Sequence, residues 1–445
     1  MRKPLLSFWF VSLIFALGLS SAIALDRQPG ADYHARREAL AKKAGGVVLL
    51  FAPLEDRDAV YGFRQSDNFY YLSGLTTPGA TLIVAPAASA QGDFPAHAYT
   101  EILFLPPRNP RMEKYTGAQL GADNPDAPKI TGFERVEEMD KLPEEVSKLL
   151  SGGRTVIYTE VASQDGGSSS AEPLAFLKRA SADVVFQDIA PLLASLRTVK
   201  DAGEIALIRK AVDASVAAHF AAMKAVKPGV TEYEISALMQ YEWGRRGCER
   251  PAYAPIVGSG HNSTVLHYSE NTNTMKAGDV VVIDAAGEYS MYAADITRTL
   301  PANGHFTARQ REIYDIVLGA QEAAIAAFQS GRTTLYGDSD ASLNKVAKDY
   351  IRSHGKDLHG QPLDQYFIHG LGHYIGLQVH DAGDYKIPLG PGMAFTIEPG
   401  IYIPEENIGV RIEDDFLVGQ DGKLIKLSGA LPSKADDVEN TMARK

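Results

Sequence analysis

The sequence predicts an α/β protein built from two domains. The chain has 445 residues, of which 45% are hydrophobic and 22% charged, so it can bury a sizeable core and is long enough for two domains, or even three. Apolar runs such as "GGVVLLFAP" (45–53) and "ATLIVAPA" (80–87) alternate with helical patterns such as "VEEMDKLPEEVSKLL" (136–150). This alternation is typical of an α/β domain.

The first residues, 1–24, are predicted to be an export signal rather than part of the fold. Arg2 and Lys3 precede an apolar run at 4–19, and the tripeptide AIA ending at Ala24 is a small-x-small cleavage site. A retained membrane anchor is the alternative, but the run is short for a bilayer span of about 20 residues. We expect cleavage after Ala24, which gives a periplasmic or secreted protein without a stable membrane span.

The remaining chain divides near residues 194–200. The α/β pattern described above occupies residues 32–193. The second domain, 198–435, opens with a long helical pattern at 201–226 that stops at a Pro-Gly pair. Another helix is predicted to start at Thr231, because its hydroxyl can cap the first turn.

Composition limits the partners of the chain. The formal net charge of −11, and the lack of clustered Lys and Arg, argue against nucleic-acid binding and favour a small molecule or a peptide. Cys248 is the only cysteine, so the chain has no internal disulfide. It lies in "EWGRRGCER" without a nearby histidine, which favours a structural role over a catalytic one.

One stretch of the second domain predicts a hairpin that carries two acids. The run "VVVIDAAGEYSMYAADITRT" (280–299) is typical of two strands around a turn at 288–290. Asp284 and Asp295 are equally distant from that turn. A tight turn would place their carboxylates opposite each other on an antiparallel pair, with Cβ atoms about 5 Å apart.

A second stretch repeats this design. In "FTIEPGIYIPEENIGVRIEDDF" (395–416), Glu398 and Glu413 are symmetric about a turn at 404–407. Like charges that face each other in a sheet repel, and burying them without a cation costs free energy or forces protonation. Four converging carboxylates with one imidazole would hold two divalent ions, as dinuclear hydrolases do. The alternative, that each acid faces water at a turn or strand edge, is less consistent with two symmetric pairs in apolar strands.

Three histidines occur in "HGLGHYIGLQVHD" (369–381). His369 and His373 have the spacing of the zinc peptidase signature H-E-x-x-H, but two glycines would cost such a helical turn about 2 kcal/mol relative to alanine. A bent or extended segment is expected, in which one histidine binds metal while the others, including His380, act as donors and proton carriers. Six histidines elsewhere are interpreted as ordinary core or surface residues: His34, His97, His219, His305, His354 and His359.

These motifs together resemble a known family. "VIDAAGEYSMYAADITRT", "HGLGHYIGLQVHD", "TIEPGIYI" and "VRIEDD", in that order and spacing, resemble the pita-bread metallopeptidases, most closely the aminopeptidase P branch. "STVLHYSEN" (263–271) and "FRQSDNFYYLSGL" (63–75) are similar to the catalytic and N-terminal domains of that branch. The resemblance covers nearly the whole mature chain. It implies an N-terminal aminopeptidase P-type domain and a C-terminal domain whose curved antiparallel sheet is covered by helices.

The resemblance also implies a metal centre. Asp284 would bind one ion, His373 and Glu398 the other, and Asp295 and Glu413 would bridge both. The ions would be manganese, which is usual in this branch. A hydroxide held between them would attack the carbonyl before proline.

Further residues surround the implied centre. Glu398 is also the family's candidate proton acceptor. Three positions match the histidines that deliver a proton to the leaving proline nitrogen and stabilise the tetrahedral intermediate: His267, His369 and His380. Arg411 lies two residues before Glu413, on the same strand face by the period of two, and could orient the bridging acids.

Two alternatives concern the function. The family includes aminopeptidases, which release the first residue from longer Xaa-Pro peptides, and prolidases, which cleave only Xaa-Pro dipeptides; residues 63–75 resemble both, and we favour the aminopeptidase. Other members have lost their metal ligands and act as binding modules, which the five intact positions argue against. The family likeness further implies a homodimer or homotetramer.

Overall fold

The structure, a computed structural model, describes most of the chain: residues 25–55, 60–89, 96, 98–151, 156–161 and 184–443. The predicted export signal and His97 lie outside the described residues. None of the described helices is both long and apolar enough to cross a membrane.

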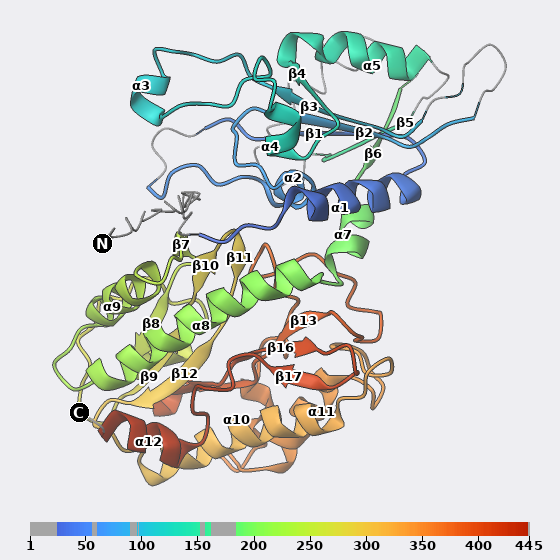
Figure 1. Cartoon of the computed structure of the whole chain (residues 1–445). Helices are drawn as coiled ribbons and strands as arrows, with labels where there is room; N and C mark the ends of the chain where they lie inside the picture. Colours follow the sequence, from blue (N-terminus) through green and yellow to red (C-terminus); the bar gives the residue numbers. More distant parts are fainter. Residues whose placement is uncertain are drawn as a thin grey trace, which may run out of the picture.

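The N-terminal part is built around a mixed sheet with the strand order β4-β3-β2-β1-β5-β6 (Figure 1). The strands are β1 (Val47–Phe51), β2 (Thr81–Ala85), β3 (Thr100–Leu105), β4 (Arg135–Glu138), β5 (Val156–Thr159) and β6 (Val185–Asp188). β2 is antiparallel to β1 and β3, and the other pairs are parallel. The helices are α1 (Gly30–Lys43), α2 (Asp67–Ser73), α3 (Glu113–Thr116), α4 (Ala127–Thr131) and α5 (Leu142–Ser151).

Both faces of this sheet are covered. Side chains alternate across β1, so Val48 and Leu50 pack with α1 and α2 on one face. Val47 and Leu49 pack on the other face with Val146 of α5. The first of these two cores continues without interruption into the C-terminal part, so the α1 side of the sheet is attached to the rest of the molecule.

A short helix, α7 (Ala190–Arg197), lies between the two parts (Figure 1). The boundary predicted at 194–200 falls at the end of this helix. Immediately after it, Val199 forms an antiparallel bridge with Met393, and the backbone N–H of Lys200 donates to the carbonyl of Gly392. The connection is therefore fixed to the C-terminal part as soon as the chain enters it.

The C-terminal part contains short, mostly antiparallel strands. The first half consists of β7 (Arg250–Pro251), β8 (Ile256–Ser259), β9 (Val280–Asp284), β10 (Gly287–Tyr289), β11 (Tyr292–Ala293) and β12 (Thr297–Pro301). The second half consists of β13 (Ala394–Ile397), β14 (Gly400–Ile403), β15 (Ile408–Arg411), β16 (Asp414–Val418) and β17 (Leu424–Lys426). The halves meet where Thr297 bridges to Glu413.

Helices cover the outside of these strands (Figure 1). They are α8 (Ala202–Ala225), α9 (Glu232–Gly244), α10 (Ala308–Ala327), α11 (Leu343–Ser353) and α12 (Ala435–Ala443). The predicted cap at Thr231 is confirmed, because its hydroxyl accepts from the N–H of Glu234 while the Glu234 carboxylate accepts from Thr231. α8 and α9 lie against the first half of the strands and α10 against the second, which leaves the inner surface of both halves for the site.

Candidate active site

The first acidic hairpin has a different register from the predicted one. Asp284 pairs with Thr297, and the tight turn is made by Ser290 and Met291, both with positive φ (50° and 72°). Two positive φ values characterise the two-residue turns that suit a twisted hairpin. The predicted direct opposition of Asp284 and Asp295 is therefore wrong. Asp295 lies two residues before Thr297, the partner of Asp284, so the two acids are diagonal neighbours on one face of the hairpin.

The second hairpin has the predicted register. Ile397 pairs with Asp414 on one side of the acidic pair, and Gly400 pairs with Arg411 on the other. Glu398 and Glu413 lie between these pairs, where the ladder is interrupted and the N–H of Glu398 donates to Leu371 O. The backbone N–H of Glu413 also donates to Thr297 O at 3.1 Å, which brings the second hairpin against the first.

The histidine segment runs as an extended, bent chain beside β13. Tyr374 bridges to Phe395, and the N–H of His373 donates to the Thr396 hydroxyl at 3.0 Å. A Cβ on Gly372 would lie 2.0 Å from the carbonyl oxygen of Thr396, so this close approach requires glycine. The prediction that the segment is not a regular helix is confirmed.

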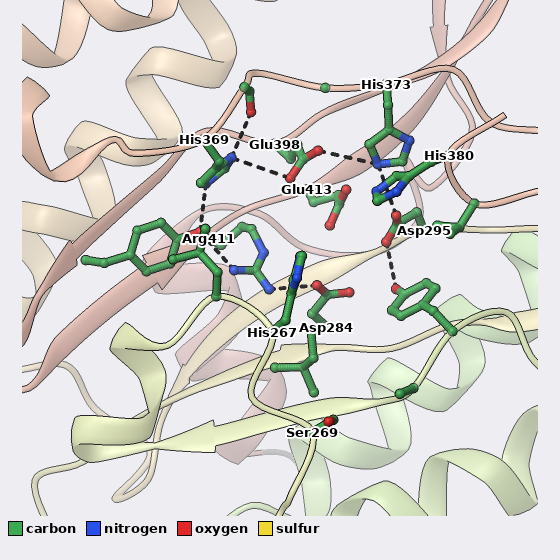
Figure 2. A pocket seen from close by; sticks show the side chains of 18 of the residues that line it. His267, Ser269, Asp284, Asp295, His369, His373, His380, Glu398, Arg411 and Glu413 are labelled. Atoms are coloured by element: carbon green, nitrogen blue, oxygen red, sulfur yellow. Dashed lines mark hydrogen bonds and ion pairs between the residues drawn. The ribbon is translucent and has the colours of Figure 1, made fainter. Parts of the chain in front are cut away.

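Three of the five predicted metal ligands already form a tight cluster. Asp295, His373 and Glu413 each offer one ligand atom, and these atoms lie within 4.8 Å of one another. The Nε2 atom of His373 is 3.3 Å from Asp295 Oδ2 and 3.4 Å from Glu398 Oε1. Figure 2 shows the Asp284 carboxylate below Asp295 and His373 in the view, next to Arg411.

The donor set fits divalent cations. The oxygens Asp284 Oδ1 and Glu413 Oε1 are buried without a hydrogen-bond partner in the described structure, as is Oδ1 of the adjacent Asp415. Unpartnered buried carboxylate oxygens are costly unless a cation meets them. His373 Nδ1 donates to the Tyr374 carbonyl at 3.1 Å, which turns Nε2 toward the acids as a ligand atom. Four carboxylates and one imidazole are suitable ligands for divalent metal ions of intermediate hardness.

Burial and mutual repulsion shift the pKa values of the residues in this cluster. Burial raises the pKa of Glu398 to about 7, against the opposing effect of His373. Burial and the nearby acids Asp295 and Glu398 raise the pKa of Glu413 well above its usual range. Burial alone would lower the pKa of His373, but Asp295 and Glu398 raise it to about 9. Without a metal, protons therefore take the place of the cations.

A hydrogen-bonded chain leads from the acids to His369. Arg411 donates from Nη2 to Asp284 Oδ2 at 2.6 Å and from Nη1 to the Tyr402 hydroxyl at 2.8 Å. Burial, and then the charge of Arg411, lower the pKa of His369 to about 4, so this ring is neutral. Its Nδ1 donates to Gly370 O at 2.7 Å, and its Nε2 accepts from the Tyr402 hydroxyl at 2.8 Å.

Arg411 also reaches the second hairpin indirectly. Its Nε donates to the Thr297 hydroxyl at 3.2 Å, and that hydroxyl donates to Glu413 Oε2 at 2.6 Å. Arg411 was expected to orient the bridging acids Asp295 and Glu413. Its direct carboxylate partner is instead Asp284, and it reaches Glu413 only through Thr297.

His267 and His380 lie at the open side of the site. Both are exposed, and both line a cavity of about 560 Å³ together with the five predicted ligands. The ring centroid of His380 is 4.3 Å from that of His373, in an edge-to-face arrangement. Burial and the charge of His373 lower the pKa of His380. The cavity therefore has the acids and His373 at its base and the imidazole rings of His267 and His380 near its opening (Figure 2).

The structure adds site residues that the sequence did not single out. The Tyr253 hydroxyl donates to Asp295 Oδ1 at 2.7 Å, and Asp415 Oδ2 accepts from the Asp295 backbone at 3.0 Å. Thr297, Tyr402 and Asp415 lie inside the quoted motifs and could have been tested for their strand face, whereas Tyr253 stands in no recognised pattern. Cys248 is buried, and burial raises the pKa of its thiol to about 12, which agrees with a structural role.

Comparison with known proteins agrees with this geometry. Residues 206–420 match the model of metallopeptidase family M24, and residues 33–158 match the aminopeptidase P N-terminal domain. The Xaa-Pro aminopeptidase of Escherichia coli is 35% identical over 440 residues, which cover 92% of this chain and 97% of that protein. The Haemophilus influenzae Xaa-Pro aminopeptidase is 34% identical over 89% of this chain and 93% of its own length.

The chain belongs to the Xaa-Pro aminopeptidase family of M24 metallopeptidases. Among solved structures, aminopeptidase P from E. coli with the inhibitor Pro-Leu superimposes with a TM-score of 0.81 at 31% identity, covering 94% of this chain and 99% of that one. Proline aminopeptidase P II from Yersinia pestis gives a TM-score of 0.80 at 33% identity, covering 94% and 100%. The predicted α/β fold with an aminopeptidase P-type N-terminal domain is confirmed.

Membership in this family also settles the class of activity. The protein is a hydrolase, a metal-dependent exopeptidase that binds divalent ions. The alternative of a prolidase is not better supported by these relatives.

Proposed function

We propose that the protein releases the N-terminal residue from peptides with proline in the second position. The observation that carries this proposal is the similarity, along nearly their whole lengths, to proteins named Xaa-Pro aminopeptidase. The site agrees with it, because the cavity has room for several residues of a peptide and ends at the cluster of acids.

Two divalent ions, which we propose to be manganese, would be held by Asp284, Asp295, His373, Glu398 and Glu413. Asp284 would serve one ion, His373 and Glu398 the other, and Asp295 and Glu413 both. Bound metal ions supply a nucleophilic hydroxide near neutral pH and polarise the scissile carbonyl. A structure of the E. coli enzyme is described as Zn substituted, so the identity of the metal requires measurement.

The protein side chains would move the protons. Glu398 lines the cavity with Oε1 3.4 Å from His373 Nε2, where its carboxylate would accept a proton. His369 Nδ1 lies 3.8 Å from Glu398 Oε2, close enough for a small movement or one water to connect them. His267 and His380 face the cavity from its open side, where they would stabilise the carbonyl oxygen and deliver a proton to the proline nitrogen.

The test compares a matched dipeptide and tripeptide. The protein is stripped of metal, reloaded with Mn²⁺ and assayed with Xaa-Pro and Xaa-Pro-Yaa that share the same first residue. We expect release of Xaa from the tripeptide with the higher kcat/KM. Activity on the dipeptide alone would make the protein a prolidase, and no metal-dependent release from either would refute the proposal.

We also propose that the protein is exported and cleaved after Ala24, and that it is a homodimer or homotetramer. The residues that would begin the mature chain are already attached to the fold: the backbone N–H of Asp26 donates to the Tyr289 hydroxyl at 3.1 Å, and Arg27 pairs with Glu249. N-terminal sequencing of protein from fractionated cells tests the cleavage, and light scattering during gel filtration tests the assembly.

A further inference from the structure

The loop that carries His380 lacks regular secondary structure. It runs from Tyr374 to Asp381 and closes on itself where the N–H of Asp381 donates to Tyr374 O at 2.8 Å. No described residue forms a hydrogen bond with the His380 ring, which packs edge to face against His373. The position of the His380 ring therefore depends on how the backbone of this loop is held.

The residue next to His380 is held by buried charges. The Asp381 carboxylate accepts from Arg197 Nη2 and from Lys200 Nζ, the latter at 2.7 Å. Arg197 also donates to Asn68 Oδ1 at 2.7 Å and lies 3.8 Å from Asp67 Oδ2. The side chains of Lys200, Asp381 and Arg197 are 0%, 2% and 5% exposed. We refer to these five residues as the Asp381 network.

The loop is shaped to admit this carboxylate. A Cβ on Gly376 would lie 2.3 Å from Asp381 Oδ2 and 3.0 Å from Lys200 Cε. The φ of Gly376 is not in the positive region, so its lack of a side chain serves the close approach and not an unusual backbone conformation. The glycine in "YIGLQVHD" therefore allows the Asp381 carboxylate to approach the backbone, a role that could not be predicted from the sequence.

Stability alone is a poor reason for such a network. Burying ion pairs costs desolvation, and well-packed apolar residues of similar volume often stabilise a protein equally well or better. Charged groups that meet in fixed directions do, however, restrict the geometry of a loop more than apolar contacts do. The location of the network beside a proposed catalytic histidine points to this second benefit.

The N-terminal part holds the other side of the same loop. Arg64 donates to Leu377 O at 2.7 Å, to Glu288 Oε2 at 2.8 Å and to Asp67 Oδ1 at 2.8 Å. Arg64, Asp67 and Asn68 all come from "FRQSDNFYYLSGL", the N-terminal motif whose purpose the metal centre does not explain. This motif thus contacts the His380 loop directly through Arg64 and indirectly through Arg197.

We propose that Asp381 is a positioning residue that fixes His380 for catalysis, and that the N-terminal part contributes to this through Arg64, Asp67 and Asn68. The proposal rests on the peptidase function proposed above. It makes the two parts of the chain one catalytic unit: the C-terminal part supplies the reacting groups, and the N-terminal motif sets the place of one of them.

A double-mutant cycle tests the proposal on the full-length, Mn²⁺-loaded protein. Asp381→Asn is measured in the wild-type and in the His380→Ala background with an Xaa-Pro-Yaa peptide. Because a displacement of about 1 Å can cost up to about 100-fold in rate, we expect Asp381→Asn to lower kcat at least tenfold, with KM changed less than about threefold. In the His380→Ala background the same change should cost nothing further. An equal loss in both backgrounds, or no loss in either, would overturn the proposal.

Two further variants separate positioning from folding. Asp381→Asn leaves the buried cations Arg197 and Lys200 without their anion, so the charge-balanced double variant Lys200→Met/Asp381→Asn is measured as well. This double variant should keep a near wild-type Tm and metal content but have a lower kcat. A wild-type kcat in the double variant would refute the positioning role. Glu101→Gln, which breaks the equally buried Arg37–Glu101 pair away from the site, is the matched control. It should lower Tm and leave kcat unchanged.

The cycle also distinguishes the two proposals. If the wild-type protein shows no metal-dependent release of Xaa, the peptidase proposal fails. If the wild type is active and His380→Ala is impaired while Asp381→Asn matches the wild type, only the positioning role fails.

Discussion

The Nε2 atom of His373 lies 3.3 Å from Oδ2 of Asp295, although one residue belongs to an irregular loop and the other to a hairpin far away in the chain. Without a metal, this contact is an ion pair, because the pKa of His373 is raised to about 9. The same two atoms would face a cation once the proton has left. Binding of a metal ion here would therefore displace the proton.

Replacing two neighbouring histidines should have unequal effects. His373→Ala removes a proposed ligand, so we expect it to lose metal and activity together. His380→Ala removes a group near the opening of the cavity, so it should lower kcat while the metal remains bound. Metal analysis of both purified variants beside the wild type checks this division. Equal metal loss in both would show that His380 is itself a ligand.

Metal affinity should increase with pH. The raised pKa values of His373, about 9, and Glu398, about 7, mean that protons occupy the site at neutral pH and must leave as metal binds. Affinity therefore falls as the pH decreases from 9 to 6. Calorimetric titration with Mn²⁺ in two buffers of different ionisation enthalpy measures the protons released, and heats that do not depend on the buffer would contradict the prediction.

Removing the metal should destabilise the fold without unfolding it. A ligand present at 100 times its Kd stabilises the native state by about 2.7 kcal/mol. For a chain of this length we therefore expect chelation to lower Tm by roughly 3 °C, and Mn²⁺ to restore it. Calorimetry before and after reloading gives the shift. An unchanged Tm after metal removal would mean that the acids do not bind metal in the native state.

Tyr402→Phe should separate the orientation of His369 from metal binding. The substitution removes one hydroxyl that links Arg411 to His369 and keeps the ring. One such hydrogen bond contributes about 1 kcal/mol, so we expect kcat to fall roughly fivefold to tenfold with metal content unchanged. Tyr336→Phe, on another tyrosine that lines the cavity, is the comparison variant. A loss of metal in Tyr402→Phe would instead show that the hydroxyl supports Asp284 through Arg411.

The sequence predicted the second hairpin better than the first for a physical reason. The turn after Ile403 has Pro404 at its start and Asn407 in the left-handed region, both of which are ordinary turn signals. Ser290 and Met291 adopt positive φ without the Asn-Gly pair that usually indicates such a turn. A turn placed one residue early was enough to misplace Asp295 relative to Asp284.

Contacts between distant segments could not be predicted from the sequence. Helix caps such as Thr231 depend on neighbours three residues away and could be predicted. The contact of Tyr253 with Asp295, and that of Arg197 with Asp381, depend on how separate elements pack. Nothing in a local pattern specifies which buried acid a remote hydroxyl or guanidinium will meet.

The ligands lie part-way along the two hairpins, whereas the turns at Ser290–Met291 and after Ile403 lie at the tips. Successive side chains point to opposite faces of a strand, so one extra residue within either paired strand, if absorbed as a shift in pairing, would turn an acid away from its partners. The spacing between each tip and its acids is therefore as much a part of the metal centre as the acids themselves. Insertions or deletions among the strand residues between each tip and its acids should therefore impair metal binding.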